Sequence, residues 1–307
     1  MGSVVALDVG GTDVKYAVVD SSGALSQEGS FPTRAHEGGE ALVRRMAERV
    51  NELRAQDASI RGVAVSTAGQ VLLDHATVSF ASNIPGLSGL NLGEALGEAT
   101  GLRCHVENDV NAAALGEQWL GAGRGARALI MLTLGTGVGG AAIMDGRLFT
   151  GARGSAGEFG HMTLYPGGDP CPCGQIGCFE RYASAGALER ATHALPDTHP
   201  AHGNLRALFD ACRAGDADAL RVLDHWVDDL ARGLANLVHG FNPDVILLGG
   251  GVSAQGAYLS ERVYARLTAR ALPSFMEGVR VETAALHNSA GLLGAARALF
   301  EKERMPS

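Results

Sequence analysis

Three cysteines and one histidine, Cys171, Cys173, Cys178 and His161, lie close together near the middle of the chain. Three thiolates and one imidazole make the Cys₃His ligand set of a closed, tetrahedral zinc site. A disulfide fits less well, because three cysteines cannot pair evenly and Cys171 lies too close to Cys173. Since four ligands fill the coordination shell of zinc, we expect a structural ion. The alternative is a buried loop whose thiols bind nothing.

Two carboxylates flank this cysteine loop. Glu158 precedes His161, and Glu180 follows Cys178. A bound zinc ion would hold both acids in fixed positions, where carboxylates beside an imidazole suit hydrogen bonding to a polyhydroxy ligand. Both could equally be solvated surface acids, as most glutamates are. This stretch by itself leaves the two interpretations open.

Size and composition limit the class of protein. The 307 residues suffice for two domains, and 46% hydrophobic residues support a substantial core. A net charge of -8 without a basic cluster disfavours nucleic acid as a partner. The sequence shows neither a secretory signal nor an apolar run of the roughly 20 residues needed to cross a bilayer, so no membrane association is expected. Because zinc thiolates fit a reducing compartment, we expect a cytoplasmic protein.

The chain begins with a strand, a glycine turn and a second strand. Residues 4–9 form a short apolar run that contains Asp8, the turn Gly10-Gly11-Thr12 follows, and residues 15–20 read as the second strand. This hairpin differs from the Rossmann and Walker loops, each of which leads from a strand into a helix. Small residues would let phosphate oxygens approach backbone N–H groups, and Asp8 could hold hydrated Mg²⁺. An ordinary hairpin turn is the alternative.

The same pattern recurs in the second half of the chain. Residues 128–134 predict a buried strand, the turn at residues 135–140 is rich in glycine, and residues 141–149 predict another strand. This recurrence suggests two related halves whose phosphate loops face each other across a cleft. A third glycine run, at residues 249–253, follows the strand predicted at 245–248 and suits a flat nucleoside.

Asp109 lies between a predicted strand at residues 103–106 and a small-residue helix at 110–120. Asp and Asn are preferred N-cap residues, so helix capping explains this position without any function. The functional interpretation is a general base at a strand end, which is where open α/β sheets bind their ligands. Both interpretations remain open from these residues alone.

The remaining elements follow from hydrophobic periodicity and turn residues. We expect helices at residues 37–53, 90–100, 205–213, 217–241 and 287–300, and a strand at 60–65. The stretch 192–204, with His193, His199 and His202, is predicted to be a surface loop; its histidines could bind a metal, although solvation is the simpler interpretation. Cys104 and Cys212 fit no ligand set and are expected in the core.

Together these motifs resemble the ROK family (repressors, open reading frames and kinases) of sugar kinases, from about Val4 to Phe300. The motifs that carry the resemblance are EFGH, CPCGQIGCFE, DVGGT, TLGTGVGGA, LLGGGVS, ENDVNAAALGE and SAGLLGAA. The resemblance implies an α/β protein of the actin-like ATPase (ribonuclease H-like) fold, with two lobes around a central cleft and a zinc-bound loop. The small lobe would comprise residues 1–113 and the C-terminal helix 287–303. The large lobe, 114–286, would carry the zinc loop and the interface of a homodimer.

The resemblance also implies roles for individual residues. Asp109 would be the catalytic base on the 6-hydroxyl of a sugar, and ATP would be bound with Mg²⁺. His161 would bind both the structural Zn²⁺, with Cys171, Cys173 and Cys178, and the sugar. The other residues implied in sugar binding are Gly69, Asn83, Asn108, Glu158 and Glu180. Those implied in binding ATP and Mg²⁺ are Asp8, Gly10, Gly11, Thr12, Lys15, Thr136, Gly137, Gly250 and Gly251.

The resemblance leaves more than one sugar open. Glucose is the first expectation, because glucose-type kinases are the commoner members. However, glucokinases of the family usually have a Pro-Gly turn where this chain has Ser66 to Gln70, a form that looks more like the N-acetylmannosamine kinases. A non-catalytic sugar-sensing repressor is a weaker alternative, because such relatives carry a winged helix-turn-helix before the first glycine loop. Polyphosphate as the donor is another, although relatives that use it tend to lack this zinc loop.

Overall fold

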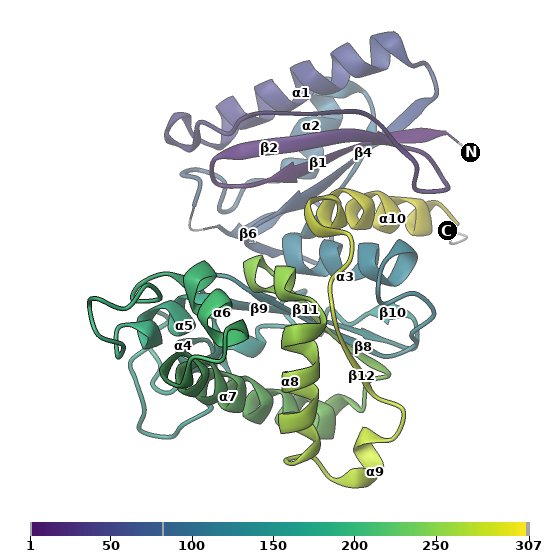
Figure 1. The fold of residues 1–307 in the computed structure, drawn as a ribbon. Helices are drawn as coiled ribbons and strands as arrows, with labels where there is room; N and C mark the ends of the chain where they lie inside the picture. The colour runs from purple at the N-terminus through teal and green to yellow at the C-terminus, as the bar shows by residue number, and fades with distance from the viewer. Residues whose placement is uncertain (1, 82, 305–307) are drawn as a thin grey trace. The chain divides into compact units, whose positions relative to one another are not determined.

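The computed structural model describes residues 2–81 and 83–304, which divide into two compact units. Unit 1 comprises Met1–Gly125, Leu148–Ala156 and Ala285–Ser307, and unit 2 comprises Ala126–Arg147 and Gly157–Ala284. Each unit contains a five-stranded mixed sheet with helices packed on it (Figure 1). The cleft expected between two lobes stays a prediction.

The sheet of unit 1 has the strand order β3-β2-β1-β4-β7. The neighbours β1–β2 and β2–β3 are antiparallel, whereas β1–β4 and β4–β7 are parallel. A small separate hairpin is formed by β5 and β6. The strands are β1 (Ser3–Val9), β2 (Asp13–Val19), β3 (Leu25–Pro32), β4 (Ile60–Thr67), β5 (Gln70–Val71), β6 (Val78–Phe80) and β7 (Arg103–Asn108).

The sheet of unit 2 repeats this arrangement in the order β10-β9-β8-β11-β12. Its central strand again forms an antiparallel hairpin on one side and parallel pairs on the other. The matching order confirms the prediction of two related halves, which was made from the repeated glycine turn. The strands are β8 (Leu129–Leu134), β9 (Val138–Met144), β10 (Arg147–Leu148), β11 (Val245–Gly249) and β12 (Arg280–Thr283).

Strand β1 shows why both faces of the first sheet are covered by helices. Successive side chains of a strand point to opposite faces, and in β1 both sets are apolar. Val5 and Leu7 pack in one cluster with residues of α1 (Gly39–Gln56) and α2 (Leu92–Thr100). Val4 and Ala6 pack in another with residues of α3 (Asp109–Leu120) and α10 (Ala290–Arg304). The sheet therefore lies between two helical layers (Figure 1).

The small residues of α3 and α10 allow these two helices to cross very closely. A Cβ atom added at Gly294 would lie 1.5 Å from the carbonyl oxygen of Ala112, and one at Gly116 would lie 2.5 Å from that of Ala290. All of α3 therefore belongs to unit 1. The first unit boundary consequently falls at Gly125, which differs from the expected boundary at residue 113 inside this helix.

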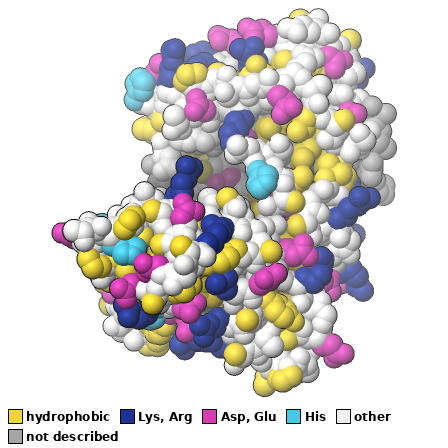
Figure 2. Space-filling view, in the orientation of Figure 1, with side chains coloured by type: hydrophobic (Ala, Val, Ile, Leu, Met, Phe, Trp, Pro, Cys, Tyr) yellow, Lys and Arg dark blue, Asp and Glu magenta, His cyan; other side chains and the backbone are white. Residues whose placement is uncertain are grey.

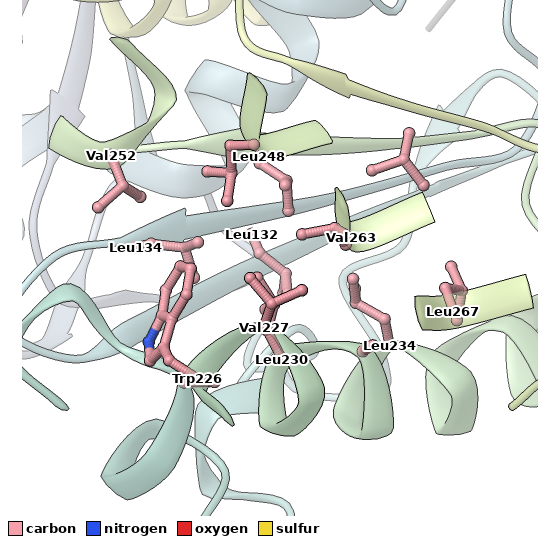
Figure 3. Close-up of a cluster of buried hydrophobic side chains, with 14 of the residues drawn as sticks. Leu132, Leu134, Trp226, Val227, Leu230, Leu234, Leu248, Val252, Val263 and Leu267 are labelled. Atoms are coloured by element: carbon pink, nitrogen blue, oxygen red, sulfur yellow. The ribbon is translucent and has the colours of Figure 1, made fainter. Parts of the chain in front are cut away.

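The core of unit 2 lies between its sheet and two long helices, α7 (Ala217–Phe241) and α8 (Ala257–Thr268). Figure 3 shows side chains of β8 and β11 meeting those of both helices, with the indole of Trp226 at one end of the cluster. The Trp226 Nε1–H donates a hydrogen bond to the Ser184 carbonyl oxygen at 2.9 Å, so its polar atom is satisfied inside the core. The shorter helices are α4 (Glu180–Ala183), α5 (Ala185–Thr192), α6 (Leu205–Arg213) and α9 (Pro273–Met276).

The long periodic segments were predicted well. Residues 205–213 and 217–241 are helices with the expected bounds, and the helix expected at 37–53 spans Gly39–Gln56. The helix expected at 287–300 begins with a 3₁₀ turn, His287–Ser289, and continues as α10. Strand β3 and helices α4, α5, α8 and α9 were not predicted. Within the described residues, no helix is long and apolar enough to cross a membrane.

The surface charges and the loop histidines have the following arrangement in the structure. Basic and acidic side chains are interspersed on the face shown in Figure 2. His193 Nδ1 lies 2.9 Å from His202 Nε2, and His199 Nε2 lies 3.3 Å from a carboxylate oxygen of Asp216. These histidines thus have partners within the chain. Of the two remaining cysteines, Cys212 is buried as expected and Cys104 is half-buried.

Candidate active site

The parallel strands of unit 1 bring two carboxylates to one edge of the sheet. Strands β1, β4 and β7 run in register, so that Asp8 pairs with Ser66, and Thr67 pairs with Asn108. Asp109 follows Asn108 directly, at the carboxyl end of β7. Asp8 acts electrostatically on Asp109 and raises its pKa. The carboxyl ends of parallel strands are where open α/β sheets bind ligands.

Asp8 is held in a crowded, largely dry position. The Ser66 Oγ–H donates to Asp8 Oδ1 at 2.8 Å, and a Cβ atom added at Gly291, in the first turn of α10, would lie 2.9 Å from the same oxygen. Burial raises the pKa of Asp8, although the Ser66 hydrogen bond and the charge of Lys15 oppose the shift. Lys15 itself donates to Asn288 Oδ1 at 3.0 Å. A cation beside Asp8 would favour its ionised form, so this position fits Mg²⁺.

Helix α3 is capped by Asn108, which argues against capping as the role of Asp109. Asn108 Oδ1 accepts hydrogen bonds from the N–H groups of Val110 and Asn111, at 2.9 and 3.1 Å. Its Nδ2 group donates to the Gly69 carbonyl oxygen at 2.8 Å and to Asp109 Oδ1 at 3.0 Å. Asn108 thus fixes Asp109 in place, and its predicted contact with sugar hydroxyls stays a prediction.

The environment of Asp109 suits a group that accepts a proton. Burial and the nearby Asp8 raise its pKa to about 6, although hydrogen bonds from Val110 and Asn108 oppose the shift. The side chain is half-buried, so a ligand can reach it. A general base works best when its pKa lies near the working pH. The site therefore offers a carboxylate that is ionised at neutral pH and more basic than an ordinary aspartate.

The other predicted residues of unit 1 lie in three loops. Gly10, Gly11 and Thr12 form the exposed turn between β1 and β2, which is anchored by the Thr33 Oγ1–H donating to the Gly10 carbonyl oxygen at 2.7 Å. Gly69 has a φ of 116° and no room for a Cβ atom, which would lie 2.2 Å from the Phe80 carbonyl oxygen. This position therefore requires glycine. Asn83 is exposed, in the loop after β6.

In unit 2, the two predicted nucleotide loops lie against each other. The turn Gly135–Gly137 joins β8 to β9 and has three residues, as the first glycine turn does. Gly250, with a φ of 83°, approaches so closely that a Cβ atom there would lie 2.3 Å from the Leu134 carbonyl oxygen. A Cβ atom at Gly137 would lie 2.4 Å from Glu180 Oε2. The carboxyl ends of β8 and β11 thus bring together five predicted site residues: Thr136, Gly137, Glu180, Gly250 and Gly251.

The cysteine loop brings its four predicted zinc ligands close together. The four predicted ligand atoms lie within 4.8 Å of one another. Cys173 Sγ is 3.6 Å from Cys178 Sγ, and Cys171 Sγ is 4.0 Å from His161 Nδ1. Zinc–sulfur bonds of 2.3 Å at tetrahedral angles place sulfur atoms roughly 3.8 Å apart. The separations within this loop are therefore compatible with a single zinc ion.

The two acids beside the cysteine loop differ in exposure. Glu180 begins α4 and is 18% exposed, with Oε1 accepting from the Cys171 thiol at 3.0 Å. Glu158 is 50% exposed and lies 4.0 Å from His161 Nε2. His161 therefore presents Nδ1 to the cysteines and Nε2 to the side where Glu158 lies. All three predicted sugar contacts of unit 2 are accordingly found around one imidazole.

Some residues of the site were not predicted individually. Ser66 donates a hydrogen bond to Asp8 and lies in a segment noted only as a turn. Gly291, where an added Cβ atom would meet Asp8, lies in a segment noted only for its small residues. Thr33 anchors the first glycine turn from a region where no element was expected. Parallel pairing of β1 with β4 is the signal that could have placed Ser66 beside Asp8.

The fold and site together define the class of protein. Two matching mixed sheets, each with a glycine turn after its central strand, carry a carboxylate of raised pKa in one unit and two carboxylates beside an imidazole in the other. Groups of these kinds are suited to accepting a proton and to hydrogen-bonding hydroxyls, as phosphoryl transfer to a sugar requires. The family model for the ROK family matches residues 4–303, and the chain belongs to the ROK family.

Similar proteins are known both by sequence and by structure. A glucokinase of Thermotoga maritima is 34% identical over 311 residues, covering 97% of this chain and 98% of that protein. The ROK family glucokinase from Streptomyces griseus, solved in complex with glucose and AMPPNP, is 32% identical with a TM-score of 0.79, covering 97% of this chain and 99% of the other. An N-acetylgalactosamine kinase of Shewanella sp. (strain ANA-3) is 30% identical and covers 94% of each chain.

Proposed function

We propose that this protein is an ATP-dependent glucokinase that transfers the γ-phosphoryl group of ATP to the 6-hydroxyl of glucose. The observation that carries the proposal is Asp109, a carboxylate fixed by Asn108 at a strand end, with a pKa of about 6. Relatives named glucokinases match nearly the whole chain, and one was solved with glucose and the ATP analogue AMPPNP. The matching sheets support the actin-like ATPase fold.

The reaction needs a deprotonated hydroxyl in line with the γ-phosphorus. Asp109 accepts the proton of the 6-hydroxyl while the hydroxyl oxygen of the sugar attacks the γ-phosphorus. The bond between the γ-phosphorus and the β–γ bridging oxygen breaks, and ADP leaves. Phosphoryl transfer depends on positioning and charge stabilisation more than on covalent help from the protein. The glycine turns at Gly10–Thr12 and Gly135–Gly137 supply backbone N–H groups for the phosphates. The run from Gly249 to Ser253 lies beside the second turn and supplies a surface for the adenosine.

Two metal ions belong to this proposal. Mg²⁺, bound with ATP, would neutralise phosphate charge, and Asp8 is the residue that would hold it. Zinc would be held by His161, Cys171, Cys173 and Cys178, and would fix the loop that presents Glu158 and Glu180. Zinc binding deprotonates the Cys171 thiol, so Glu180 would lose the hydrogen bond from that thiol and become free to accept one from a sugar hydroxyl. His161 would offer its Nε2–H to the sugar.

On the acid side, the pH profile of kcat/KM for glucose should follow the ionisation of the Asp109 carboxyl group. Its carboxyl must be ionised to accept a proton, so kcat/KM for glucose should fall about tenfold per pH unit below pH 6. At saturating MgATP, the value of kcat/KM for glucose reports the enzyme form that has not yet bound the sugar. Initial rates from pH 5 to 8, at fixed ionic strength and saturating MgATP, give the profile. A midpoint near pH 4, the ordinary value for aspartate, would contradict the assignment.

The main alternative is an N-acetylhexosamine kinase, N-acetylmannosamine being the first candidate. It is favoured by the turn from Ser66 to Gln70, which includes Gly69, and an N-acetylgalactosamine kinase is among the relatives. A kinetic comparison of glucose, mannose, N-acetylmannosamine and N-acetylgalactosamine with MgATP decides between them. We expect the highest kcat/KM for glucose. A tenfold preference for an N-acetylhexosamine, about 1.4 kcal/mol, would overturn the glucose assignment while leaving the kinase reaction intact.

Two further expectations belong to the same proposal. We propose that the protein is a homodimer, as the family resemblance implies, and sedimentation of the purified chain tests this. We also propose that the protein is located in a reducing compartment such as the cytoplasm, because the three zinc-binding thiolates would be lost to oxidation elsewhere.

A further inference from the structure

A second cluster of potential metal ligands lies in unit 1, far along the sequence from the cysteine loop. It consists of His75, His105 and Glu107, and one ligand atom from each lies within 4.8 Å of the other two. His105 and Glu107 are two residues apart on β7, so both side chains point to the same face of the sheet. His75 reaches this face from the loop between β5 and β6. None of these residues has a role in the proposed phosphoryl transfer.

The separations match those of ligands around one ion. His75 Nδ1 lies 3.3 Å from Glu107 Oε2, and His105 Nε2 lies 3.8 Å from the same oxygen. Zinc bonds of 2.0–2.2 Å at tetrahedral angles place neighbouring N and O ligands roughly 3.3–3.6 Å apart. The two imidazoles stack with ring centroids 4.7 Å apart. Because the nitrogen lone pairs lie in the ring planes, an ion could contact all three side chains once the imidazoles turn out of this stacked arrangement.

Three imidazole nitrogens of the cluster make no well-formed hydrogen bond. Among the described residues, His75 Nδ1 and both ring nitrogens of His105 are buried without a hydrogen-bond partner. The side chain of His105 is 5% exposed and that of Glu107 is 4% exposed. Buried polar atoms are nearly always hydrogen-bonded, yet two of these nitrogens face only the Glu107 carboxylate, at 3.3 and 3.8 Å, without good hydrogen-bond geometry. A bound cation would satisfy two of them, the nitrogens that face Glu107.

The surroundings orient the cluster as a ligand set. Glu107 Oε1 accepts hydrogen bonds from Asn111 Nδ2 and from the Asn108 N–H, both at 3.0 Å, which leaves Oε2 directed toward the imidazoles. Such second-shell hydrogen bonds are typical of carboxylates that bind metals. His75 has a left-handed backbone with a φ of 51°, and its carbonyl oxygen accepts from the Val106 N–H at 2.9 Å. The strained loop is thus held where the imidazole reaches β7.

We propose that His75, His105 and Glu107 form a second binding site for a divalent transition metal of the zinc class. Two imidazoles and one carboxylate suit Zn²⁺ or Co²⁺ better than Mg²⁺ or Ca²⁺, which prefer oxygen ligands. His75 is 27% exposed, so the ion can enter from solvent and keep a water as its fourth ligand. The ion fastens the loop between β5 and β6 to β7, whose end carries Asn108 and Asp109.

Metal stoichiometry in variant proteins tests this site. The full chain is dialysed against micromolar Zn²⁺, and zinc per chain is measured by mass spectrometry. We expect two equivalents in the parent and one in His75→Asn, because asparagine tolerates the left-handed backbone but lacks the imidazole. Loss of a ligand should weaken binding at the second site at least about 100-fold, beyond the cost of losing an outer-shell partner. The variant Cys178→Ser should retain the zinc equivalent at the second site, which is the one that His75→Asn loses.

His193→Asn is the matched control, because His193 and His202 form an exposed imidazole pair that could collect zinc without a built site. This variant should keep both equivalents. Cobalt gives a second readout, since the second equivalent of Co²⁺ should add ligand-field absorption without thiolate charge transfer. A parent that binds one equivalent, a His75→Asn variant that keeps two, or loss of the second equivalent in His193→Asn would each overturn the proposal.

Discussion

Replacing Asp109 with asparagine should lower turnover by about 10²–10⁴-fold, the usual cost of losing a positioned general base. An amide cannot accept the proton of the sugar hydroxyl, although it can still hydrogen-bond to that hydroxyl, so affinity for glucose should change much less. Folding should also survive, because Asn108 supplies the helix cap. The pKa of Asp109 is raised on folding, so ionisation of this group opposes folding above about pH 6. The neutral amide should therefore leave the melting temperature at pH 7.5 unchanged or raised.

The measurements are kcat, glucose affinity and melting temperature for Asp109→Asn and the parent. Asp57→Asn is the matched control, because Asp57 is also a carboxylate of unit 1 that accepts a backbone N–H, from Ser59 at 2.8 Å, outside the site. It should keep the turnover of the parent. Near-normal turnover in Asp109→Asn would refute the base assignment. A fall in melting temperature confined to Asp109→Asn would instead indicate a structural role.

Loss of the proposed zinc ion from the cysteine loop should be the second large effect. Cys178 is fully buried, and Glu180 begins α4 two residues later. Replacing one thiolate should release the zinc ion of this loop, because apparent binding free energies of about 10–16 kcal/mol at structural zinc sites depend on the complete ligand set. Glu180 and His161 would then lose their fixed positions. We expect Cys178→Ser to lower kcat/KM for glucose at least about 100-fold, as when a mutation misplaces reacting groups by 1 Å.

Cys212→Ser is the control for this substitution. Cys212 is a buried cysteine of the same unit, on α6, and it fits no ligand set. The control should keep both its zinc and its activity. Zinc content, kcat/KM and melting temperature are compared across the parent and the two variants. Full activity in Cys178→Ser after complete loss of the loop zinc would contradict a structural zinc that supports the sugar contacts.

Local sequence pattern was enough to predict much of this fold. Helices α6 and α7 have regular apolar spacing, and their predicted bounds match the structure. The repeated glycine turn predicted two related halves, and the strand order confirms them. The clustering of His161 with the three cysteines of the loop was predicted from residue types and spacing, because zinc sites place their ligands close together in sequence. These are features in which neighbouring residues determine the structure.

Contacts between distant segments could not be predicted in the same way. The Ser66 hydrogen bond to Asp8 depends on parallel pairing of β1 with β4, which no local pattern specifies. The role of Asn108 as helix cap was missed because Asn and Asp cap equally well and stand side by side here. The cluster of His75, His105 and Glu107 depends on where an irregular loop meets β7. The edge strand β3 lacks a strong apolar alternation, with most of its side chains exposed.

The most direct test of the account is the product formed from glucose and MgATP by the purified, zinc-loaded protein. Phosphorus NMR of the reaction identifies both the leaving group and the position of the new phosphate ester. The account predicts equal amounts of ADP and glucose 6-phosphate, with kcat/KM for glucose of about 10⁴ M⁻¹s⁻¹ or more. A folded, zinc-loaded protein that forms no sugar phosphate from glucose, or that phosphorylates a hydroxyl other than the 6-hydroxyl, would contradict it.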